Sequence, residues 1–595
     1  MRTSCMNVAG VLVLFAGAAE AQWTQRASVD GAGAQANAGS AYPVASADGR
    51  FVAFESLASN LVPGDTNLHY DVFVRDLWNR TIERVSVDSA GTQGNGDSAY
   101  AGISADGRFV SFASRSTNLV PGDTNNWQDT FVRDRLLGTT ERVSLSSSGL
   151  QGNKDSFGGS VSADGRYVAF MSQASNIVTP DYVSTLDCFV RDRLNGTTLR
   201  VSNTYAGGPG NLHSYWPVIS ADGRFVAFHS AASNIIATDF NGTIDVFVYD
   251  MASGVNQLVS RSSAGVQGDF ASSYPSISAD GRFVAFHSIA LNLVPGDTNM
   301  LQDVFVRDLV GGTTERISLG VGGVQADADC GWAVISADGN SVSFESAATN
   351  LVPGDTNNSV DIFLADHSRA TLERVDLDNA GLQANAGCVG SSVSADGRWV
   401  AFASSATNLV PADSNGVDDI FVRDLRATGF TSLCDAGMLG VLACPCANPP
   451  AGLGQGCDNS SATGGAILSA SGPAYLSDDH LLFVVAGEKP TAASILLQGD
   501  AFVSAGASFG QGVRCVGGQL KRLYVRNAVG GSLSLPNAAL GDPSVSARSF
   551  ALGDPIQAGQ SRWYLMYYRD PTVLGGCSAL STFNATQTGE ISWNP

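Results

Sequence analysis

Residues 103–112 read ISADGRFVSF, and the tetrapeptide Ser-Ala-Asp-Gly within this stretch occurs seven times along the chain. The interval between copies is always 58 residues. The copies begin at Ser46, Ser104, Ser162, Ser220, Ser278, Ser336 and Ser394. A constant period without insertion or deletion indicates seven copies of one structural unit.

The second copy shows what one unit contains. Runs rich in Val, Phe and Ile predict four strands, A to D, at 100–104, 109–114, 129–134 and 140–146. Asp106-Gly107 between the first two predicts a type I′ hairpin turn. Four antiparallel strands repeated seven times are typical of a β-propeller. The sequence therefore predicts an all-β chain with a seven-bladed propeller of 58-residue repeats.

The ends of the repeat region predict a closed ring. Residues 24–30 (TQRASVD) match the fourth strand in register, because Ser28 precedes Ser46 by 18 residues, as Ser86 precedes Ser104. The seventh repeat lacks a recognisable fourth strand of its own. We therefore expect the N-terminal strand to complete the last blade.

These repeats resemble a known family. The strings ISADGRFVAF (219–228), DVFVRDL (71–77) and TTERVS (139–144) are similar to the TolB-type, WD40-like propeller repeat of exported bacterial proteins. The resemblance covers about residues 23–424 and implies a binding platform. It does not specify a ligand, because propellers serve many functions.

Composition shifts divide the chain into four parts. Residues 1–21 have an apolar run and end in Ala19-Glu20-Ala21, which predicts a secretory signal peptide. The propeller is expected over 22–426, a Pro/Gly-rich linker over 427–456, and a small cysteine-rich, β-sandwich-like domain over 457–595. The predicted location is secreted, periplasmic or at the cell surface.

Cysteine usage fits an oxidising compartment. Six cysteines in the last third predict a disulfide framework whose pairing stays open among fifteen possibilities. They are Cys434, Cys444, Cys446, Cys457, Cys515 and Cys577. Cys330 and Cys388 occupy one column of adjacent repeats, so a disulfide between them is a further candidate. Cys188 would then remain a free thiol.

The charge balance excludes some partners. The formal net charge is −21, with 34 Lys and Arg against 55 Asp and Glu. Lysine occurs only at Lys154, Lys489 and Lys521. Such a surface repels nucleic acid and anionic membranes, and beyond the signal segment no stretch predicts a membrane span. Cations, basic proteins and neutral glycans remain as partners.

The long loops carry repeated oxygen ligands. The B–C and D–A connections are the long ones, and strand alternation places both on one face of the ring, where binding usually resides. An Asp-x-Asn-x-x-x-Asp pattern recurs in the B–C loop. Its members are Asp65, Asn67 and Asp71; Asp123, Asn125 and Asp129; Asp239, Asn241 and Asp245; Asp297, Asn299 and Asp303; Asp355, Asn357 and Asp361; and Asp413, Asn415 and Asp419. The third repeat keeps Asp181 and Asp187 but has Val183 between them.

Two interpretations of this pattern stay open. Closely spaced carboxylates and amides suit Ca²⁺, which takes six to eight oxygen ligands. Asp and Asn also brace loops by bonding nearby backbone groups. We expect the Asn60 column to act in this second way.

Departures from the repeat give two more candidates. Asp97, Asp155 and His213 stand at one position of successive repeats, at the expected channel mouth, where they form a candidate cation or polar-ligand site. Their alternative is ordinary solvated loop positions. A second column holds Glu55, His229, His287 and Glu345 on strand B, for which inter-blade hydrogen bonding is predicted in preference to metal binding.

The expected function is non-catalytic. Strand A carries no Asp, Glu, His or Lys to serve as an acid, a base or a metal ligand at the channel. The sequence therefore predicts a secreted binding or scaffold protein that uses the long-loop face for a protein or glycan, with no cofactor beyond the calcium considered above. The alternative is an extracellular polysaccharide hydrolase or lyase whose site lies at the channel mouth.

Overall fold

The computed structural model describes two compact units of the chain. The described residues are 22–182, 185–367, 370–425, 431–434, 436–437, 441–446, 448–451, 455–471, 474, 476, 479, 481–537, 540–557, 559–572 and 582–593. The first unit is Trp23–Leu425, and the second contains the C-terminal part. The predicted signal segment 1–21, Val183 and Cys577 lie outside the described residues.

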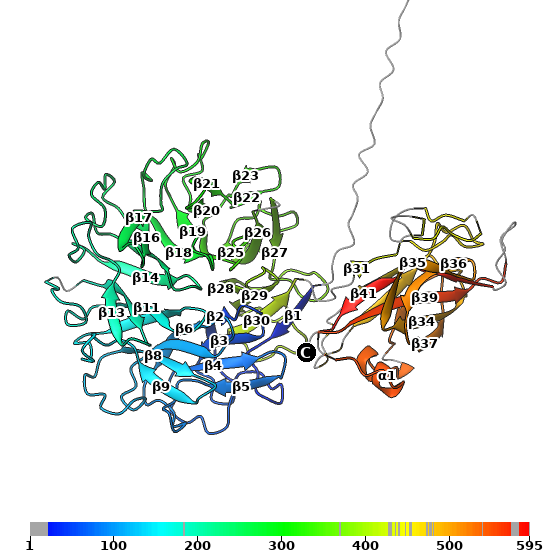
Figure 1. The fold of residues 1–595 in the computed structure, drawn as a ribbon, viewed down its shortest axis with the longest axis horizontal. Coiled ribbons are helices and arrows are strands. Elements are labelled where there is room, and N and C mark those ends of the chain that lie inside the picture. Colours follow the sequence, from blue (N-terminus) through cyan, green and yellow to red (C-terminus); the bar gives the residue numbers. More distant parts are fainter. Residues whose placement is uncertain are drawn as a thin grey trace, which may run out of the picture. The chain divides into compact units, whose positions relative to one another are not determined.

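The first unit contains, in its described part, seven antiparallel sheets of four strands each (Figure 1). The first three sheets are β2 (Ser40–Ala45), β3 (Phe51–Ser56), β4 (Asp71–Asp76) and β5 (Thr81–Arg84); β6 (Ser98–Ile103), β7 (Phe109–Ser114), β8 (Asp129–Asp134) and β9 (Thr139–Arg142); and β10 (Ser156–Val161), β11 (Tyr167–Ser172), β12 (Asp187–Asp192) and β13 (Thr197–Arg200).

The next sheets follow the same order. They are β14 (Ser214–Ile219), β15 (Phe225–Ser230), β16 (Asp245–Asp250) and β17 (Val255–Leu258); β18 (Ser272–Ile277), β19 (Phe283–Ser288), β20 (Asp303–Asp308) and β21 (Thr313–Arg316); and β24 (Cys330–Ile335), β25 (Ser341–Ser346), β26 (Asp361–Asp366) and β27 (Thr371–Arg374). The last is β28 (Cys388–Val393), β29 (Trp399–Ser404), β30 (Asp419–Asp424) and β1 (Trp23–Arg26). A short hairpin, β22 (Leu319–Gly320) with β23 (Val324–Gln325), lies in one loop.

The sheets close into a ring. The first strand of each sheet contacts the first strand of the next, and β28 of the last sheet contacts β2 of the first. This is a β-propeller. Neighbouring sheets share their cores: Val72 and Val85 of the first pack with Phe112 and Phe131 of the second. Phe112 and Phe131, which recur at the same positions of every repeat, are thus fully buried in these shared cores.

The N-terminal strand closes the ring, as its register predicts. β1 pairs antiparallel with β30, with Trp23 opposite Asp424. Just after it, the hydroxyl of Ser28 donates to the carboxylate of Asp419 at 2.5 Å. Ala27 and Ser28 are fully buried. Residues 23–26 therefore form the fourth strand of the last sheet.

The type I′ prediction for the Asp-Gly turn is wrong. Only Gly107 has a positive φ (72°), and its N–H donates to the carbonyl of Ser104 at 2.9 Å. This is a type I turn followed by a left-handed glycine. Asp106 is held because its carboxylate accepts from the hydroxyl of Ser104 and the N–H of Arg108. The ring of Phe51 in the preceding sheet packs where a Cβ on Gly107 would lie.

The second unit combines two β layers. Its largest sheet has the order β31 (Thr431–Ser432), β41 (Gly589–Ser592), β39 (Ser561–Arg569), β34 (Ala493–Gly499) and β37 (Lys521–Asn527), with β40 (Phe583–Ala585) paired to β39. A second sheet contains β32 (Ile467–Ser471), β33 (Leu482–Ala486) and β38 (Leu533–Leu535). Leu468 and Phe483 of the second sheet share one core with Leu496 and Tyr564 of the first. The hairpin β35 (Ala501–Phe509) with β36 (Gly512–Gly517) and a short helix, α1 (Val545–Ala551), complete the unit.

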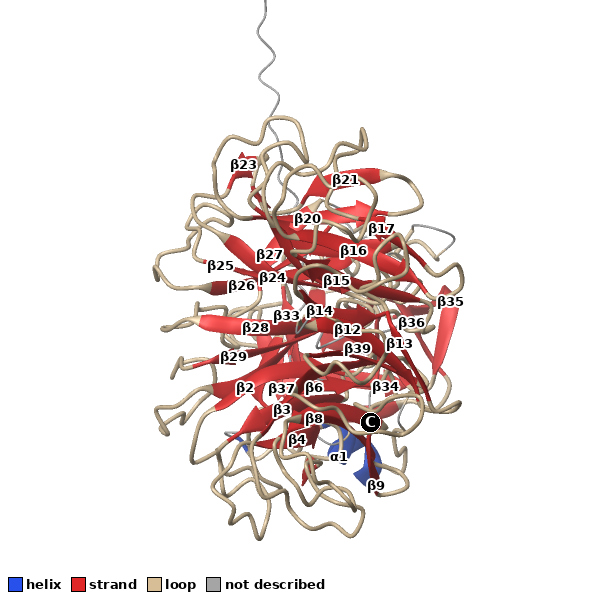
Figure 2. Ribbon diagram, turned by 90° about the vertical axis from the view of Figure 1, so that its left-hand side faces the viewer, coloured by secondary structure: helices blue, strands red, loops and turns tan. Residues whose placement is uncertain are grey.

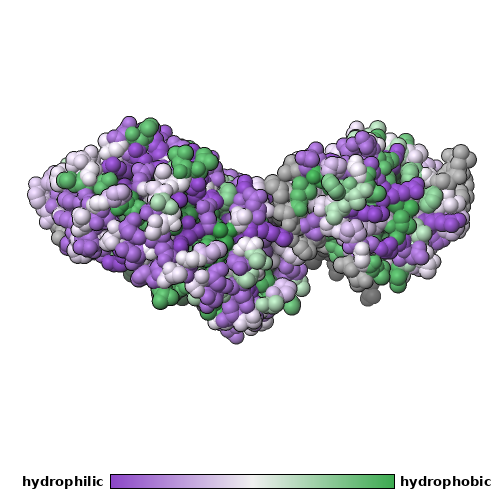
Figure 3. Space-filling model, turned by 90° about the horizontal axis from the view of Figure 1, so that it is seen from below, coloured by the Kyte–Doolittle hydropathy of each residue, from purple (hydrophilic) through white to green (hydrophobic). Residues whose placement is uncertain are grey.

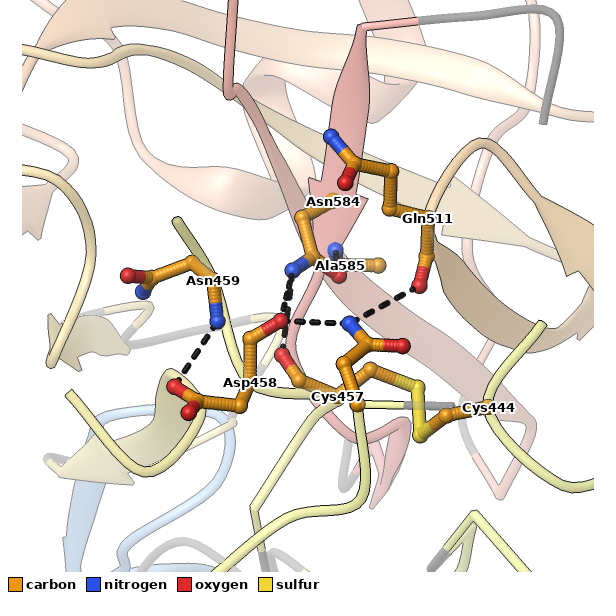
Figure 4. The surroundings of a disulfide bond; sticks show 8 residues. Cys444, Cys457, Asp458, Asn459, Gln511, Asn584 and Ala585 are labelled. Atoms are coloured by element: carbon orange, nitrogen blue, oxygen red, sulfur yellow. Dashed lines mark hydrogen bonds between the residues drawn. A yellow bond between two sulfur atoms is a disulfide. The ribbon is translucent and has the colours of Figure 1, made fainter. Parts of the chain in front are cut away.

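Two disulfides are described in this unit, Cys434–Cys515 and Cys444–Cys457. Cys446 is also disulfide-bonded. Beside the second bridge, the amide of Asn584 donates to the carbonyls of Cys457 and Asp458 at 3.1 and 2.8 Å (Figure 4). This part of the predicted disulfide framework is confirmed. Among the described residues, no helix is long and apolar enough to cross a membrane.

Candidate functional site

Long loops gather at one face of the propeller. In the first sheet the B–C loop spans 57–70 and the D–A loop 85–97, whereas the other two connections span only 46–50 and 77–80. Figure 2 shows such loops, in tan, extending beyond the strand ends. As predicted, the side chain of Asn60 braces them: it donates to the carbonyl of Gln35 and accepts from the N–H of Asn37.

In six of the seven sheets an arginine side chain forms ion pairs with both aspartates of the B–C loop. It comes from strand D, and its nitrogens lie 2.9–3.6 Å from the oxygens of both aspartates. These arginines are Arg26, Arg84, Arg142, Arg200, Arg316 and Arg374. In the first sheet the Nδ2 of Asn67 also donates to Asp71.

The guanidinium provides the positive charge that a calcium ion would otherwise supply. Both carboxylates and the arginine are nearly inaccessible to solvent, so they form a buried ion pair rather than an open cation site. We therefore assign loop bracing to the carboxylates of these six sheets. The exception is the fourth sheet, with Asp239 and Asp245, where Leu258 replaces the arginine.

The channel-mouth candidates have a bracing role. Each accepts a backbone N–H from the preceding sheet. The bonds are Tyr70 N to Asp97 Oδ1 (3.1 Å), Gln128 N to Asp155 Oδ1 (2.8 Å) and Leu186 N to His213 Nδ1 (2.8 Å). Asp97 also contacts His69, and Asp155 contacts Arg115. Each of the three side chains therefore stabilises its own loop with local hydrogen bonds. They do not form one shared ligand site.

Three members of the strand B column form the predicted inter-blade hydrogen bonds, whereas His287 bonds to Ser273 of its own sheet at 2.7 Å. The bonds are Tyr100 N to Glu55 Oε2 (3.0 Å), Tyr274 N to His229 Nδ1 (3.2 Å) and Gly390 N to Glu345 Oε2 (3.2 Å). Burial raises the pKa of both glutamates. It lowers the pKa of His229 to about 3 and that of His287 to about 4. Both histidines are thus neutral near pH 7.

The disulfide candidate Cys330–Cys388 is wrong, because both cysteines are free and buried. Each replaces a serine at the start of strand A and takes over its hydrogen bond within its own sheet. The thiols donate to the hydroxyls of Ser346 and Ser404 at 3.3 and 3.2 Å. Cys188 is also free, as predicted.

A set of aromatic residues on the first strands was not recognised from the sequence. At the third position of strand A, five of seven sheets carry Tyr or Trp in the left-handed backbone region, with φ between 47° and 56°. We call these residues the channel aromatics: Tyr42, Tyr100, Trp216, Tyr274 and Trp332. The other two sheets have Gly158 and Gly390 there, also with positive φ.

The channel aromatics form a closed cycle. Each ring contacts two others of the set. The centroid distances are 6.3 Å for Tyr42–Tyr100, 5.5 Å for Tyr100–Trp216, 6.1 Å for Trp216–Tyr274, 4.7 Å for Tyr274–Trp332 and 6.5 Å for Trp332–Tyr42. The cycle passes over the two glycine positions, so it surrounds the centre of the ring of sheets.

This arrangement is strained and accessible. A left-handed backbone costs a non-glycine residue about 1–3 kcal/mol, and every sheet has the register irregularity at this point that produces it. Tyr42 is 47% exposed and Trp332 37%. Strain repeated at exposed aromatic residues is characteristic of binding surfaces rather than of cores.

The electrostatic surroundings of the channel aromatics are negative. Burial raises the pKa of the Tyr42 hydroxyl, and the nearby Glu55, Tyr100, Tyr274 and Glu345 raise it further. The ring of Tyr274 also lies 5.2 Å from those of both His229 and His287. Hydroxyls and carboxylates thus gather beside the apolar ring faces, which gives the site both stacking surfaces and hydrogen-bonding groups.

On the face seen in Figure 3 the propeller unit is mostly hydrophilic, with hydrophobic residues scattered in small groups. Exposed aromatic residues elsewhere, such as Trp127 and Tyr182 in B–C loops, do not belong to the cycle. The channel aromatics are therefore our candidate site.

Comparisons with known proteins concern the fold. No protein-family model matches the chain, and no curated protein matches it. Similar solved structures include an oligogalacturonate lyase in complex with manganese (12% identity, TM-score 0.40, 65% of this chain and 90% of that one) and a putative TolB from Agrobacterium tumefaciens (17%, 0.32, 60% and 97%). Another is the Cps50 (Swd1) β-propeller domain of Myceliophteria thermophila (10%, 0.35, 64% and 96%). Similarities this distant carry no argument about function.

Proposed function

We propose that this chain is an exported, non-catalytic binding protein that holds a glycan on its channel aromatics. The observation that carries the proposal is the closed cycle of five Tyr and Trp side chains. Each of these residues has a left-handed backbone conformation that non-glycine residues rarely adopt. Strain of this kind persists only where the surrounding structure enforces it. The enforced backbone conformation holds the five rings in place before a ligand arrives, which lowers the entropic cost of binding.

A glycan fits the chemistry of the cycle. The C–H face of a sugar ring packs on an aromatic face, while sugar hydroxyls bond to groups such as the hydroxyls of Tyr42 and Tyr274. A folded protein partner would instead contact the loops themselves, so its binding would not depend on the channel aromatics.

A non-catalytic role is favoured over the polysaccharide hydrolase or lyase. Such an enzyme needs an acid and a base free to reach the substrate. Asp97, Asp155 and His213 are engaged with backbone N–H groups. Glu55 and Glu345 each accept a backbone N–H as well and are largely buried. Export is supported by the disulfides of the C-terminal unit, which form in oxidising compartments.

The test is a glycan array with the full chain, followed by titration calorimetry with the strongest glycan. Trp332→Ala removes one ring of the cycle and should weaken binding about tenfold or more, since stacking of a ligand on one aromatic side chain contributes about 1–3 kcal/mol. Trp127→Ala removes a similarly exposed tryptophan outside the cycle and should leave the affinity unchanged. Equal affinities of the two variants, or release of shortened saccharides during incubation, would contradict the proposal.

A further inference from the structure

The fourth sheet departs from the other six at the buried ion pair. Asp239 and Asp245 are retained, and Asp245 is fully buried. On β17, however, Leu258 stands where strand D of every other sheet supplies an arginine. Two carboxylates therefore face one another without the guanidinium that neutralises their equivalents.

A glutamine side chain takes up the vacant hydrogen bonds. The Nε2 of Gln267 donates to both Asp239 and Asp245, at 2.8 Å each. In five of the other six sheets an equivalent glutamine bonds to the loop, and the remaining sheet has Pro209 there. Gln325, for example, donates to the carbonyl of Gly296 and accepts from Arg316. The neutral amide provides hydrogen bonds to the two carboxylates but does not neutralise their negative charges. Burial, together with the charge of the neighbouring Asp239, raises the pKa of Asp245 to about 6.

The loss of the arginine coincides with a cavity. A cavity of about 910 Å³ opens beside Gln267, lined among others by Asn241, Leu258 and Val266. Val255 and Phe240 also line it. Val255 replaces the threonine found in both neighbouring sheets, and Phe240 stands where the following sheet has Thr298 and the preceding one Tyr182. Its walls are thus more apolar than their equivalents, and Phe240 and Val255 are well exposed at its rim. Three departures from the repeat converge on one opening.

We propose that this cavity binds the arginine side chain of a peptide or protein partner, whose guanidinium replaces the missing arginine between Asp239 and Asp245. The chain itself contains six examples of what fits there, since equivalent carboxylates hold a guanidinium at 2.9–3.6 Å in the other sheets. The cavity is the independent observation: it gives a side chain room to reach Gln267 from solvent. Gln267 contacts both carboxylates, neither of which lines the cavity itself. This site is separate from the channel aromatics and does not depend on the proposed function.

Binding requires one rearrangement. The amide of Gln267 moves away from the carboxylates toward the loop, where its equivalents lie, and the guanidinium takes its place. Charged hydrogen bonds replace neutral ones, which strengthens the interaction with the aspartates. The methylene groups of the arginine pack on Leu258, Val255 and Phe240. Arg261 also lines the cavity, and its buried Nε has no hydrogen-bond partner in the described part of the chain.

The experiment is calorimetric titration of the full chain with N-acetyl-arginine methylamide. The neutral isostere N-acetyl-citrulline methylamide serves as the matched probe. We expect saturable binding of the arginine probe and at least about tenfold weaker binding of the citrulline probe, because only the former brings charge to the carboxylates. Absence of binding up to millimolar concentration, or equal binding of the two probes, would overturn the inference.

Two variants locate the binding. Leu258→Arg restores the arrangement of the other sheets, so it should abolish binding and raise the melting temperature. Asp239→Asn should weaken binding about tenfold and provides a second reading if the first variant fails to fold, because Asp239 is only partly buried. Arginine binding that persists in a folded Leu258→Arg protein would place the probe elsewhere on the acidic surface and refute the assignment.

Discussion

Replacing Arg142 by leucine is expected to lower the free energy of unfolding by about 3–5 kcal/mol, because it leaves two buried carboxylates without a counter-charge. The arginine lies 3.3 Å from Asp123 and 3.1 Å from Asp129, and Asp129 has no exposed surface. Leucine keeps most of the volume but none of the charge. The change is measured by chemical denaturation of the full chain, following the propeller by tryptophan fluorescence.

Arg108→Leu is the matched control. Arg108 also pairs with an aspartate, Asp134, at 2.7 Å, but its side chain is 34% exposed. Exposed pairs contribute only about 0–1 kcal/mol, so this variant should lose far less stability. The unfolding free energy of the unaltered chain should also be the same with calcium and with excess chelator. Equal losses in the two variants, or a strong calcium dependence, would contradict the assignment of the arginine as the resident cation.

Deleting residues 22–30 should destabilise the propeller by more than any single substitution. The deletion removes β1 and leaves the edge of β30 unpaired. It also removes Arg26, the counter-charge of Asp413 and Asp419, and the hydroxyl of Ser28. The loss of the ion pair alone corresponds to about 3–5 kcal/mol. We expect a large fall in melting temperature, with protease cleavage first in the seventh sheet.

A synthetic peptide of residues 22–30 provides the control for this deletion. Added in trans, it should pair with β30 and recover much of the lost melting temperature, whereas a scrambled peptide should not. A truncated chain that melts at the temperature of the intact one would show that the ring does not depend on β1.

Most of the fold follows from the repeat. Strands B and C of the second copy begin and end where predicted, at Phe109–Ser114 and Asp129–Asp134, because dense Val and Phe mark both. Strand D is shorter than predicted, Thr139–Arg142 rather than 140–146. After Arg142 the regular strand pairing ends: the hydroxyl of Ser144 donates to the carboxylate of Asp129 at the start of β8, and the N–H of Ser146 bonds to the carbonyl of Leu150 within the D–A loop. Hydrophobic pattern alone does not reveal this competition.

The candidate site was harder to predict. The arginine column was visible at 58-residue spacing, but its partners lie across a hairpin and become neighbours only when the register of β8 and β9 is known. The channel aromatics were visible too, as Tyr42, Tyr100, Trp216, Tyr274 and Trp332 in one column. The alternation of side chains along a strand assigns these residues to one face of their sheet. It does not indicate the register irregularity of strand A at which the five rings turn toward each other. Cys330 and Cys388 show the opposite case: they occupy the same position in adjacent repeats, yet they do not bond to each other.

Oxidative footprinting tests the central claim most directly. The full chain is exposed to hydroxyl radicals with and without the glycan selected on the array, and modification of each tryptophan is measured by mass spectrometry. A ligand held by the channel aromatics should protect Trp216 and Trp332 and leave Trp127 as reactive as before. Protection of Trp127 with unchanged oxidation of Trp216 and Trp332 would place the ligand on the loops and contradict the account.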